Sequence, residues 1–301
     1  MLLFWITTQT AFAQFGQSKN WTDADLEAVS KQTNPQNLRL VFVYWPPSGF
    51  RRLDNNSDRP MLTDAGIAHL SRMTQLVSLE CEFQTNLTDE SLKHVAGLTN
   101  LQVLRFHGAK FTDAGLAHIR NLTQLRDFQI GRASVTDASM PIVGSFKRLR
   151  TLDLQHAGVS DAGLENLKGL TELNWLCLNH TKITSVGLRN LQGLTNLTWL
   201  ILEGTAVDSD GLPSISALPK LTTLYLSGTK VGDTGMRHLA KLKSLERLKL
   251  NGDSIGDAGL NAFVSSKALK EIEIYGHRVS DEGMAAFRRA RPDVKVITDR
   301  N

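Results

Sequence analysis

The chain has 301 residues, of which 41% are hydrophobic, enough to fill a continuous core, and 21% are charged. Its net charge of +4 is a mild excess, and the acidic residues are spread along the chain, so the charge pattern does not favour a nucleic-acid-binding protein. The two cysteines, Cys81 and Cys177, are too few to indicate a compartment.

The N-terminal segment MLLFWITTQTAFA is apolar and ends in Ala11-Phe12-Ala13, a small-x-small pattern typical of signal-peptide cleavage sites. It is too short to span a bilayer, and no other stretch of the sequence is apolar enough to be transmembrane. We interpret residues 1–13 as a clipped signal peptide whose natural start lies upstream, since no Lys or Arg precedes the apolar run. This interpretation predicts a secreted or periplasmic protein.

Residues 14–37 are expected to form a helical cap, because Trp21-Thr-Asp-Ala-Asp-Leu26 matches half of a phrase that recurs later in the chain. A first strand is expected from Leu38. The next begins at Leu76, so this repeat carries an insertion at about residues 44–60. The insertion is rich in Pro and Gly and contains the aromatic cluster Tyr44–Phe50, which predicts an ordered loop.

From Leu76 onward one phrase returns every 24 residues, after a single step of 25. It reads L-x-x-L-x-L, a small polar turn, a β-branched residue, Thr or Ser, Asp, any residue, then Gly-Leu. Strands are expected to begin at Leu76, Leu101, Leu125, Leu149, Leu173, Leu197, Leu221, Leu245 and Leu269. A last strand at Val294–Ile297 ends a repeat region of residues 38–297, with 298–301 as a tail. A fixed period of this length indicates a solenoid.

Side-chain direction predicts how each repeat is built. The first, fourth and sixth residues of L-x-x-L-x-L point inward, and the third and fifth lie on the open face of a parallel sheet. Thr or Ser followed by Asp is expected to cap a short helix. Because helices are wider than strands, the stack should curve into an α/β horseshoe with the sheet on its concave side and the helices on its convex side.

The pattern resembles leucine-rich repeats, specifically the 24-residue bacterial kind, and is similar to the GALA-type and cysteine-containing subfamilies. The resemblance covers about residues 21–297 and implies a right-handed horseshoe. Many leucine-rich repeats have Asn or Cys at the ninth position, bonded to neighbouring turns. In this chain the ninth position holds alanine or threonine, at Ala109, Ala133, Ala157, Thr181, Thr205 and Thr229. The threonine hydroxyls would be able to donate a hydrogen bond to the next turn, whereas the alanines would not.

Two patterns raise the question of a metal site, and both have a simpler explanation. Four histidines share one helix position in different repeats, where helix spacing keeps them too far apart for common ligation; they are His69, His94, His118 and His238. His156 and His180 share a turn position and can approach each other, but turn histidines usually face solvent. Helix capping explains the aspartate column, because Ser185 and Ser209 interrupt it and a metal ladder would not tolerate that; the column is Asp89, Asp113, Asp137, Asp161, Asp233, Asp257 and Asp281.

The sequence contains no phosphate-binding loop, G-x-S-x-G, H-E-x-x-H or C-x-x-C motif. It therefore predicts no enzyme, no cofactor and no metal site.

The third and fifth strand positions predict a binding site on the concave face. Adjacent repeats place two tryptophans in one column, about 5 Å apart and near enough to stack, beside a second column of large side chains. Acidic and polar residues flank this patch on one side and two cations on the other, as in a protein-binding hot spot. The candidate residues are Trp175, Cys177, Trp199, Ile201, Tyr225, Arg247 and Lys249.

These features predict a non-catalytic module that binds a protein or peptide. One alternative is a carbohydrate-binding protein that uses the Trp/Tyr platform, and another is that large side chains merely cover a flat sheet. A further alternative is an F-box-type adaptor, because similar repeats follow an F-box in that family. Residues 14–37 are too few for that motif and already hold the cap, so the F-box would be missing from this chain.

Export has a direct test. N-terminal sequencing of the native protein should begin at or close to Gln14, because cleavage after Ala13 follows from the Ala11-Phe12-Ala13 pattern. An intact segment 1–13 on a soluble cytoplasmic protein would contradict the prediction.

Overall fold

The structure, a computed structural model, describes residues 22–31, 38–42, 62–81, 84–251 and 254–299. The predicted signal peptide at 1–13 and the insertion at 44–60 lie outside the described residues.

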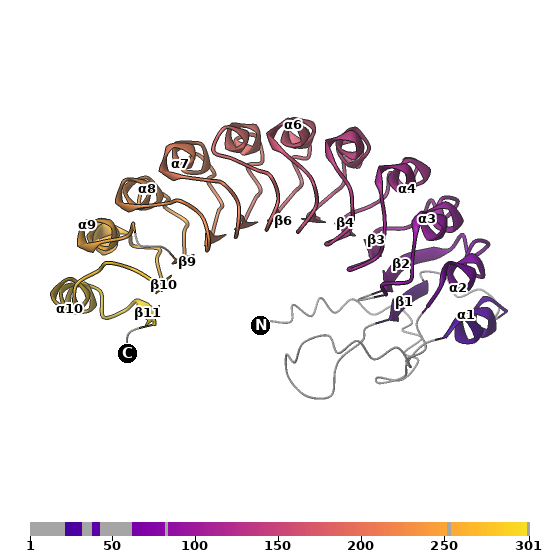
Figure 1. Ribbon diagram of the computed structural model, residues 1–301, viewed down its shortest axis with the longest axis horizontal. Coiled ribbons are helices and arrows are strands. Elements are labelled where there is room, and N and C mark those ends of the chain that lie inside the picture. The colour runs from indigo at the N-terminus through magenta and orange to yellow at the C-terminus, as the bar shows by residue number, and fades with distance from the viewer. Residues whose placement is uncertain (1–21, 32–37, 43–61, 82–83, 252–253, 300–301) are drawn as a thin grey trace.

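Within the described residues, eleven parallel strands form one sheet, and each strand pairs with the next one in the chain (Figure 1). The register follows the period of the sequence, since Trp175 pairs with Trp199 and Cys177 with Ile201. The strands are β1 (Leu38–Phe42), β2 (Leu76–Cys81), β3 (Val103–Arg105), β4 (Asp127–Gln129), β5 (Thr151–Asp153), β6 (Trp175–Cys177), β7 (Trp199–Ile201), β8 (Thr223–Tyr225), β9 (Arg247–Asn251), β10 (Glu271–Tyr275) and β11 (Lys295–Thr298).

Short helices line the outer side of the arc and the strands line its inner side, which confirms the predicted horseshoe (Figure 1). The α-helices are α1 (Asp23–Ser30), α2 (Asp64–Ala68), α3 (Asp89–Val95), α4 (Asp113–His118), α5 (Met140–Val143), α6 (Asp161–Leu164), α7 (Leu212–Ile215), α8 (Asp233–Leu239), α9 (Asp257–Asn261) and α10 (Asp281–Ala290). Short 3-10 helices precede, extend or replace them in several repeats; they are η1 (Asp137–Ser139), η2 (Glu165–Leu167), η3 (Gly187–Leu191), η4 (Ser209–Gly211) and η5 (Ala262–Ser265).

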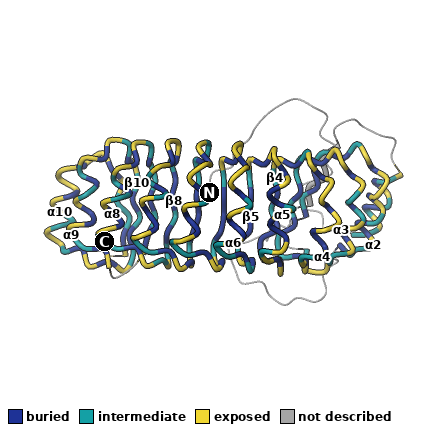
Figure 2. Tube along the Cα trace, turned by 90° about the horizontal axis from the view of Figure 1, so that it is seen from above, coloured by how far each residue is buried: buried dark blue, intermediate teal, exposed yellow. Residues whose placement is uncertain are grey.

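The core runs without interruption between the sheet and the helices. In the repeat that contains β6, the first, fourth and sixth residues of the strand phrase, Leu173, Leu176 and Leu178, are fully buried. The β-branched residue that turns the chain back, Ile183, is also fully buried. Buried segments recur in every turn of the tube in Figure 2. The inward positions predicted from the phrase are therefore correct.

The aspartates act between repeats, which corrects the prediction that they cap their own helices. Thr112 caps α4, since its Oγ1 accepts from the N–H of Ala114 at 3.3 Å. Asp113 instead reaches the next repeat, where its two oxygens accept from the backbone N–H and the Oγ1 of Thr136 at 2.9 and 2.7 Å. We call this contact the inter-repeat aspartate link. It recurs at Asp23–Thr63, Asp64–Thr88, Asp89–Thr112, Asp137–Ser160, Asp161–Thr184 and Asp257–Ser280.

The same link explains the glycine of the repeat phrase. A Cβ atom on Gly115 would lie 2.1 Å from Oδ1 of Asp89 in the preceding repeat, a distance that no real contact allows. At the break in the aspartate column the two partners exchange roles. Ser185 occupies the aspartate position and its hydroxyl donates to Asp208, which stands in place of the threonine, at 2.5 Å.

The ninth-position threonines do not bond to the next turn, which corrects a second prediction. The Oγ1 of Thr181 donates to the carbonyl of Leu178 in its own repeat, at 2.7 Å. Backbone bonds join successive turns instead, and they run equally through the alanine repeats, as from the N–H of Gly108 to the carbonyl of Gly131 at 2.9 Å. The alanines therefore leave no gap in the ladder.

Leu178 tests the assignment of the core. Leu178→Ala should lower the free energy of unfolding by about 2–5 kcal/mol, because it opens a cavity at a fully buried site. Denaturant unfolding followed by circular dichroism measures the change, and melting should become stepwise because each repeat contacts its neighbours alone. An unchanged midpoint would mean that the repeat frame is misassigned.

The aspartate link should make stability depend on pH. Partial burial opposes ionisation of Asp113, but hydrogen bonds from Ser139 and Thr136 outweigh it and hold the pKa of Asp113 below its ordinary value. Because the folded pKa is the lower one, the stabilisation is complete above the unfolded value of about 3.9. It is lost as pH falls through the folded pKa.

Asp113→Asn should therefore cost about 1–2 kcal/mol of unfolding free energy near neutral pH. The difference from wild type should shrink below about pH 4. Asp281→Asn is the matched control, because Asp281 holds the same place in α10 and no helix follows it among the described residues. Equal losses in the two variants would show that the aspartates act on their own helices.

Candidate functional site

Three aromatic residues stand at the middle of the concave sheet. Trp175, Trp199 and Tyr225 lie on the neighbouring strands β6, β7 and β8, and each side chain is partly exposed. We call these three residues the aromatic patch. The register places Trp199 directly beside Trp175 and Tyr225 beside Ile201, as the sequence predicts.

Trp199 and Tyr225 form the ring contact of the patch. The centroids of Trp199 and Tyr225 are 6.1 Å apart, with their planes inclined by 58°. The strand pairing places Trp175 and Trp199 side by side, near enough to stack as predicted, but the ring contact that Trp199 makes is with Tyr225. Strand spacing brings the two Cα atoms together, but tilted aromatic pairs are favoured over face-to-face stacking. The indole of Trp199 lies against Tyr225 and Arg247 instead.

The two cations of β9 lie over two of the three rings of the patch. The guanidinium carbon of Arg247 lies 5.3 Å from the ring centre of Trp199, and its Nε donates to Oγ1 of Thr223 at 3.2 Å. The Nζ of Lys249 lies 5.4 Å from the ring centre of Tyr225 and 3.1 Å from Oε1 of Glu203. Both side chains therefore cross β8 and rest over the aromatic rings. Sequence reasoning placed them at a rim.

Glu203 was not among the sequence candidates, although it fixes the position of Lys249. Partial burial disfavours the charged lysine, but the ion pair with Glu203 outweighs it and raises the pKa of Lys249. Glu203 follows β7, two residues past the fifth strand position, so the search over the third and fifth positions missed it. Its acidic character next to the aromatic columns was the available signal.

Cys177 and Ile201 are buried, which corrects their predicted exposure. They retain 3% and 8% of their accessible surface. Their strand positions place both on the concave side, where neighbouring side chains leave little of their surface accessible. Burial, followed by the charge of Asp153, raises the pKa of the Cys177 thiol. Cys177 is thus a packing residue that holds its proton, and both cysteines of the chain are buried.

The N-terminal half of the concave face is polar, and its charges are engaged with each other. Arg105 forms ion pairs with Glu80, at 2.7 Å, and with Asp127. Further along, Nε2 of His107 lies 3.0 Å from Oδ2 of the buried Asp153. This half of the face therefore presents a satisfied polar network beside the aromatic patch.

A second group of side chains lies where the strands end. His156 and His180, from consecutive turns, stack with ring centroids 4.5 Å apart and planes inclined by 19°. The contact shows that the two histidines do approach each other. Among the described residues, no group of three or more His, Cys, Asp or Glu side chains is arranged to hold a metal ion.

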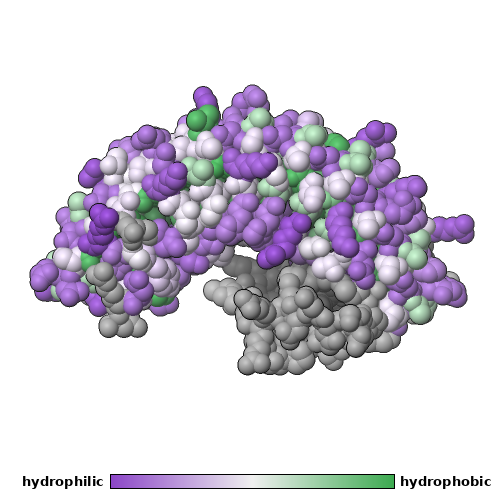
Figure 3. Space-filling model, in the orientation of Figure 1, coloured by the Kyte–Doolittle hydropathy of each residue, from purple (hydrophilic) through white to green (hydrophobic). Residues whose placement is uncertain are grey.

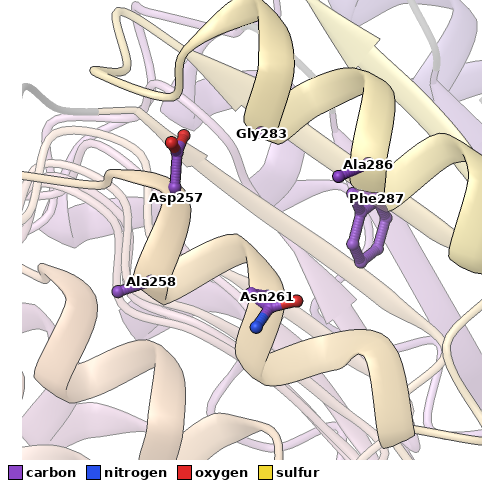
Figure 4. Close-up of a pocket in the computed structure, with 6 residues that line it drawn as sticks. All are labelled: Asp257, Ala258, Asn261, Gly283, Ala286 and Phe287. Carbon is purple, nitrogen blue, oxygen red and sulfur yellow. The ribbon is translucent and has the colours of Figure 1, made fainter.

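The outer surface offers less chemistry. A pocket of about 330 Å³ lies between α9 and α10 on the convex side and is lined by Asp257, Ala258, Asn261, Gly283, Ala286 and Phe287 (Figure 4). The Asp257 carboxylate is occupied by the Oγ of Ser280 at 2.7 Å. Hydrophilic residues cover most of the face seen in Figure 3. In the described part of the chain, no helix has the length and apolar character needed to cross a membrane.

Comparisons with known proteins agree with this architecture. Residues 132–287 match the family described as leucine-rich repeat region. Internalin C2 from Listeria monocytogenes has a TM-score of 0.55 and 25% identity, over 70% of this chain and 84% of that chain. The plant peptide hormone receptor RGFR1 in complex with RGF2 has a TM-score of 0.48 and 13% identity, over 77% of this chain and 44% of that chain. A second Listeria monocytogenes internalin, inlF, has a TM-score of 0.46 and 18% identity, over 78% of this chain and 83% of that chain. No curated protein matches the sequence.

Proposed function

The chain belongs to the leucine-rich repeat family, and we propose that it is a non-catalytic module that binds a protein or peptide on its concave sheet. The observation that supports this most is the aromatic patch with Arg247 and Lys249 resting on its rings. Trp, Tyr and Arg are the residue types that dominate binding energy at protein interfaces. Here they meet on one continuous surface at the middle of the arc.

The patch is also held in place before any partner arrives. Trp199 is fixed between Tyr225 and Arg247, and Lys249 is fixed over Tyr225 by Glu203. Ordering a flexible side chain at an interface costs roughly 0.5–1.5 kcal/mol. A patch whose side chains are already ordered avoids much of that cost, which favours a specific binding surface over a chance cluster.

The same contacts weigh against the carbohydrate alternative. A sugar ring stacks on a free aromatic face, and Arg247 lies over the face of Trp199 while Lys249 lies over Tyr225. Within the patch, Trp175 alone has no such cation over it among the described contacts. A protein partner can use ring edges and cations together, so it fits the arrangement better.

We also propose that the repeats are of the 24-residue bacterial kind, similar to the GALA-type subfamily, and that the protein is secreted or periplasmic. The regular period supports the first point, and the Ala11-Phe12-Ala13 pattern supports the second. The mild net charge gives no reason to expect a nucleic acid as partner.

Binding should depend on the tryptophans while folding does not. Trp175→Ala combined with Trp199→Ala should change unfolding free energy by about 1 kcal/mol or less, because both side chains lie on the surface of the sheet. Affinity for the partner should fall by at least about thirtyfold, which corresponds to about 2 kcal/mol for a lost hot spot. The measurement is a comparative pull-down with both chains as bait, followed by titration of the protein that wild type alone retains.

The control replaces His69, His94 and His118 by Gln on the convex side, and it should bind as wild type does. A partner that the double tryptophan variant binds with unchanged affinity would exclude the aromatic patch. The Tyr44–Phe50 insertion would then be the next place to examine.

A further inference from the structure

Three consecutive turns hold bulky residues in a backbone conformation that favours glycine. Arg132, His156 and His180 have φ angles of 72°, 59° and 53°. The same position in four other described repeats is glycine, with φ between 57° and 82°, at Gly108, Gly204, Gly228 and Gly276. Left-handed backbone is unfavourable for residues with a Cβ atom, although histidine adopts it more readily than most. Where such residues recur despite the cost, a function of their side chains is the natural hypothesis.

The three side chains form a row along one edge of the concave sheet. The N–H of Arg132 donates to the carbonyl of Gln155, and the N–H of His156 donates to the carbonyl of Asn179, so the turns follow one another at strand spacing. The imidazoles of His156 and His180 stack. A Cβ atom on Gly204 would lie 2.2 Å from Nδ1 of His180, so the glycine of the next turn leaves the space that this ring occupies.

No carboxylate in the described residues pairs with this row. Asp153 is held by His107 at 3.0 Å and by the N–H of Gln155 at 2.8 Å, and Glu203 is paired with Lys249. Arg132, His156 and His180 are all exposed. One guanidinium and two imidazole side chains therefore face solvent side by side.

We propose that Arg132, His156 and His180 bind acidic side chains of a protein partner at the edge of the concave site. The row rests on the proposed function, because it lies beside the aromatic patch: Trp175 begins β6, and His180 follows five residues later in the same repeat. Five extended residues span roughly 16 Å. A partner segment that seats an apolar residue near Trp175 thus reaches the row with an acidic residue a few positions away.

The histidines make this contact dependent on pH. Three charged or titratable groups lie near His156: Arg132 on one side, His180 on the other, and the Asp153 carboxylate. Lys182 follows His180 two residues later in the chain. Partial loss of solvation, followed by the charges of His180 and Arg132, lowers the pKa of His156, although the Asp153 carboxylate acts in the opposite direction. The free row therefore disfavours the charged form of His156. A bound carboxylate favours protonation of the imidazoles, so affinity rises as pH falls.

The test compares wild type with the triple variant Arg132→Gly, His156→Gly and His180→Gly, which has at these positions the glycine found in the other repeats. The probe is a fluorescein-labelled oligoglutamate peptide, with oligoglutamine as the uncharged match, followed by fluorescence anisotropy at low salt. Wild type should bind oligoglutamate about three- to tenfold more tightly at about pH 5.5 than at about pH 7.5, and it should not bind oligoglutamine. The triple variant should lose this binding with a melting temperature equal to or above that of wild type, because glycine relieves the left-handed backbone.

Two further variants separate the possible failures. His156→Asn with His180→Asn keeps residues that tolerate left-handed backbone, so it should fold and lose the pH dependence. The double tryptophan variant should still bind oligoglutamate, because this probe has no apolar residue to contact the aromatic patch. The test of the row is therefore independent of whether the aromatic patch binds a partner. Oligoglutamate binding that survives the triple variant, or that is equal at both pH values, overturns the proposal. A triple variant that melts well below wild type would show that the histidine stack has a structural role, and this result also overturns the proposal. The proposal is likewise overturned if heparin binds through the same residues more tightly than oligoglutamate does.

Discussion

The inter-repeat aspartate link is the contact on which the rest of the solenoid depends. Helices of four to seven residues, such as α3 to α8, are too short to persist alone, and their first N–H groups lack partners inside the helix. In most repeats a carboxylate from the preceding repeat accepts an N–H at the start of the helix and places negative charge at the positive end of the helix dipole. At the break in the column the hydroxyls of Ser185 and Ser209 accept instead. Each of these helices is therefore completed by its neighbour, which ties successive repeats together on the convex side.

The curvature of the sheet decides what the concave face can present. Side chains on the inner side of an arc converge, and Cys177, Ile201 and Thr223 are buried there. Long side chains have no room to stand upright and lie across adjacent strands, as Arg247 and Lys249 do. On this curved sheet the side chains of the concave face therefore form two layers, with cationic side chains lying over aromatic rings.

The sequence specified much of this architecture and less of the site. The spacing of Leu149, Leu152 and Leu154 is enough to predict strands, register and core, because burial depends on periodicity alone. The partner of Asp113 was missed because capping is a local pattern, whereas Thr136 lies 23 residues away. The alternation of side chains along a strand predicts which face Cys177 lies on, but it does not predict that Cys177 is buried. Strand spacing predicts the distance between Trp175 and Trp199, but it does not predict their rotamers. These properties depend on neighbouring repeats in space.

A repeat protein also supplies its own standard for judging departures from the pattern. The turn after each strand shows what the backbone favours, since glycine holds the left-handed position before and after the row of Arg132, His156 and His180. The concave columns give a similar comparison, since among the described strands β2 to β10 aromatic residues occupy the third or fifth position only in β6, β7 and β8. The row and the aromatic patch overlap in a single repeat, where β6 carries Trp175 and leads into His180. Under the two proposals, a ligand centred on this repeat would contact both groups, and the middle of the arc would combine binding energy with charge selectivity.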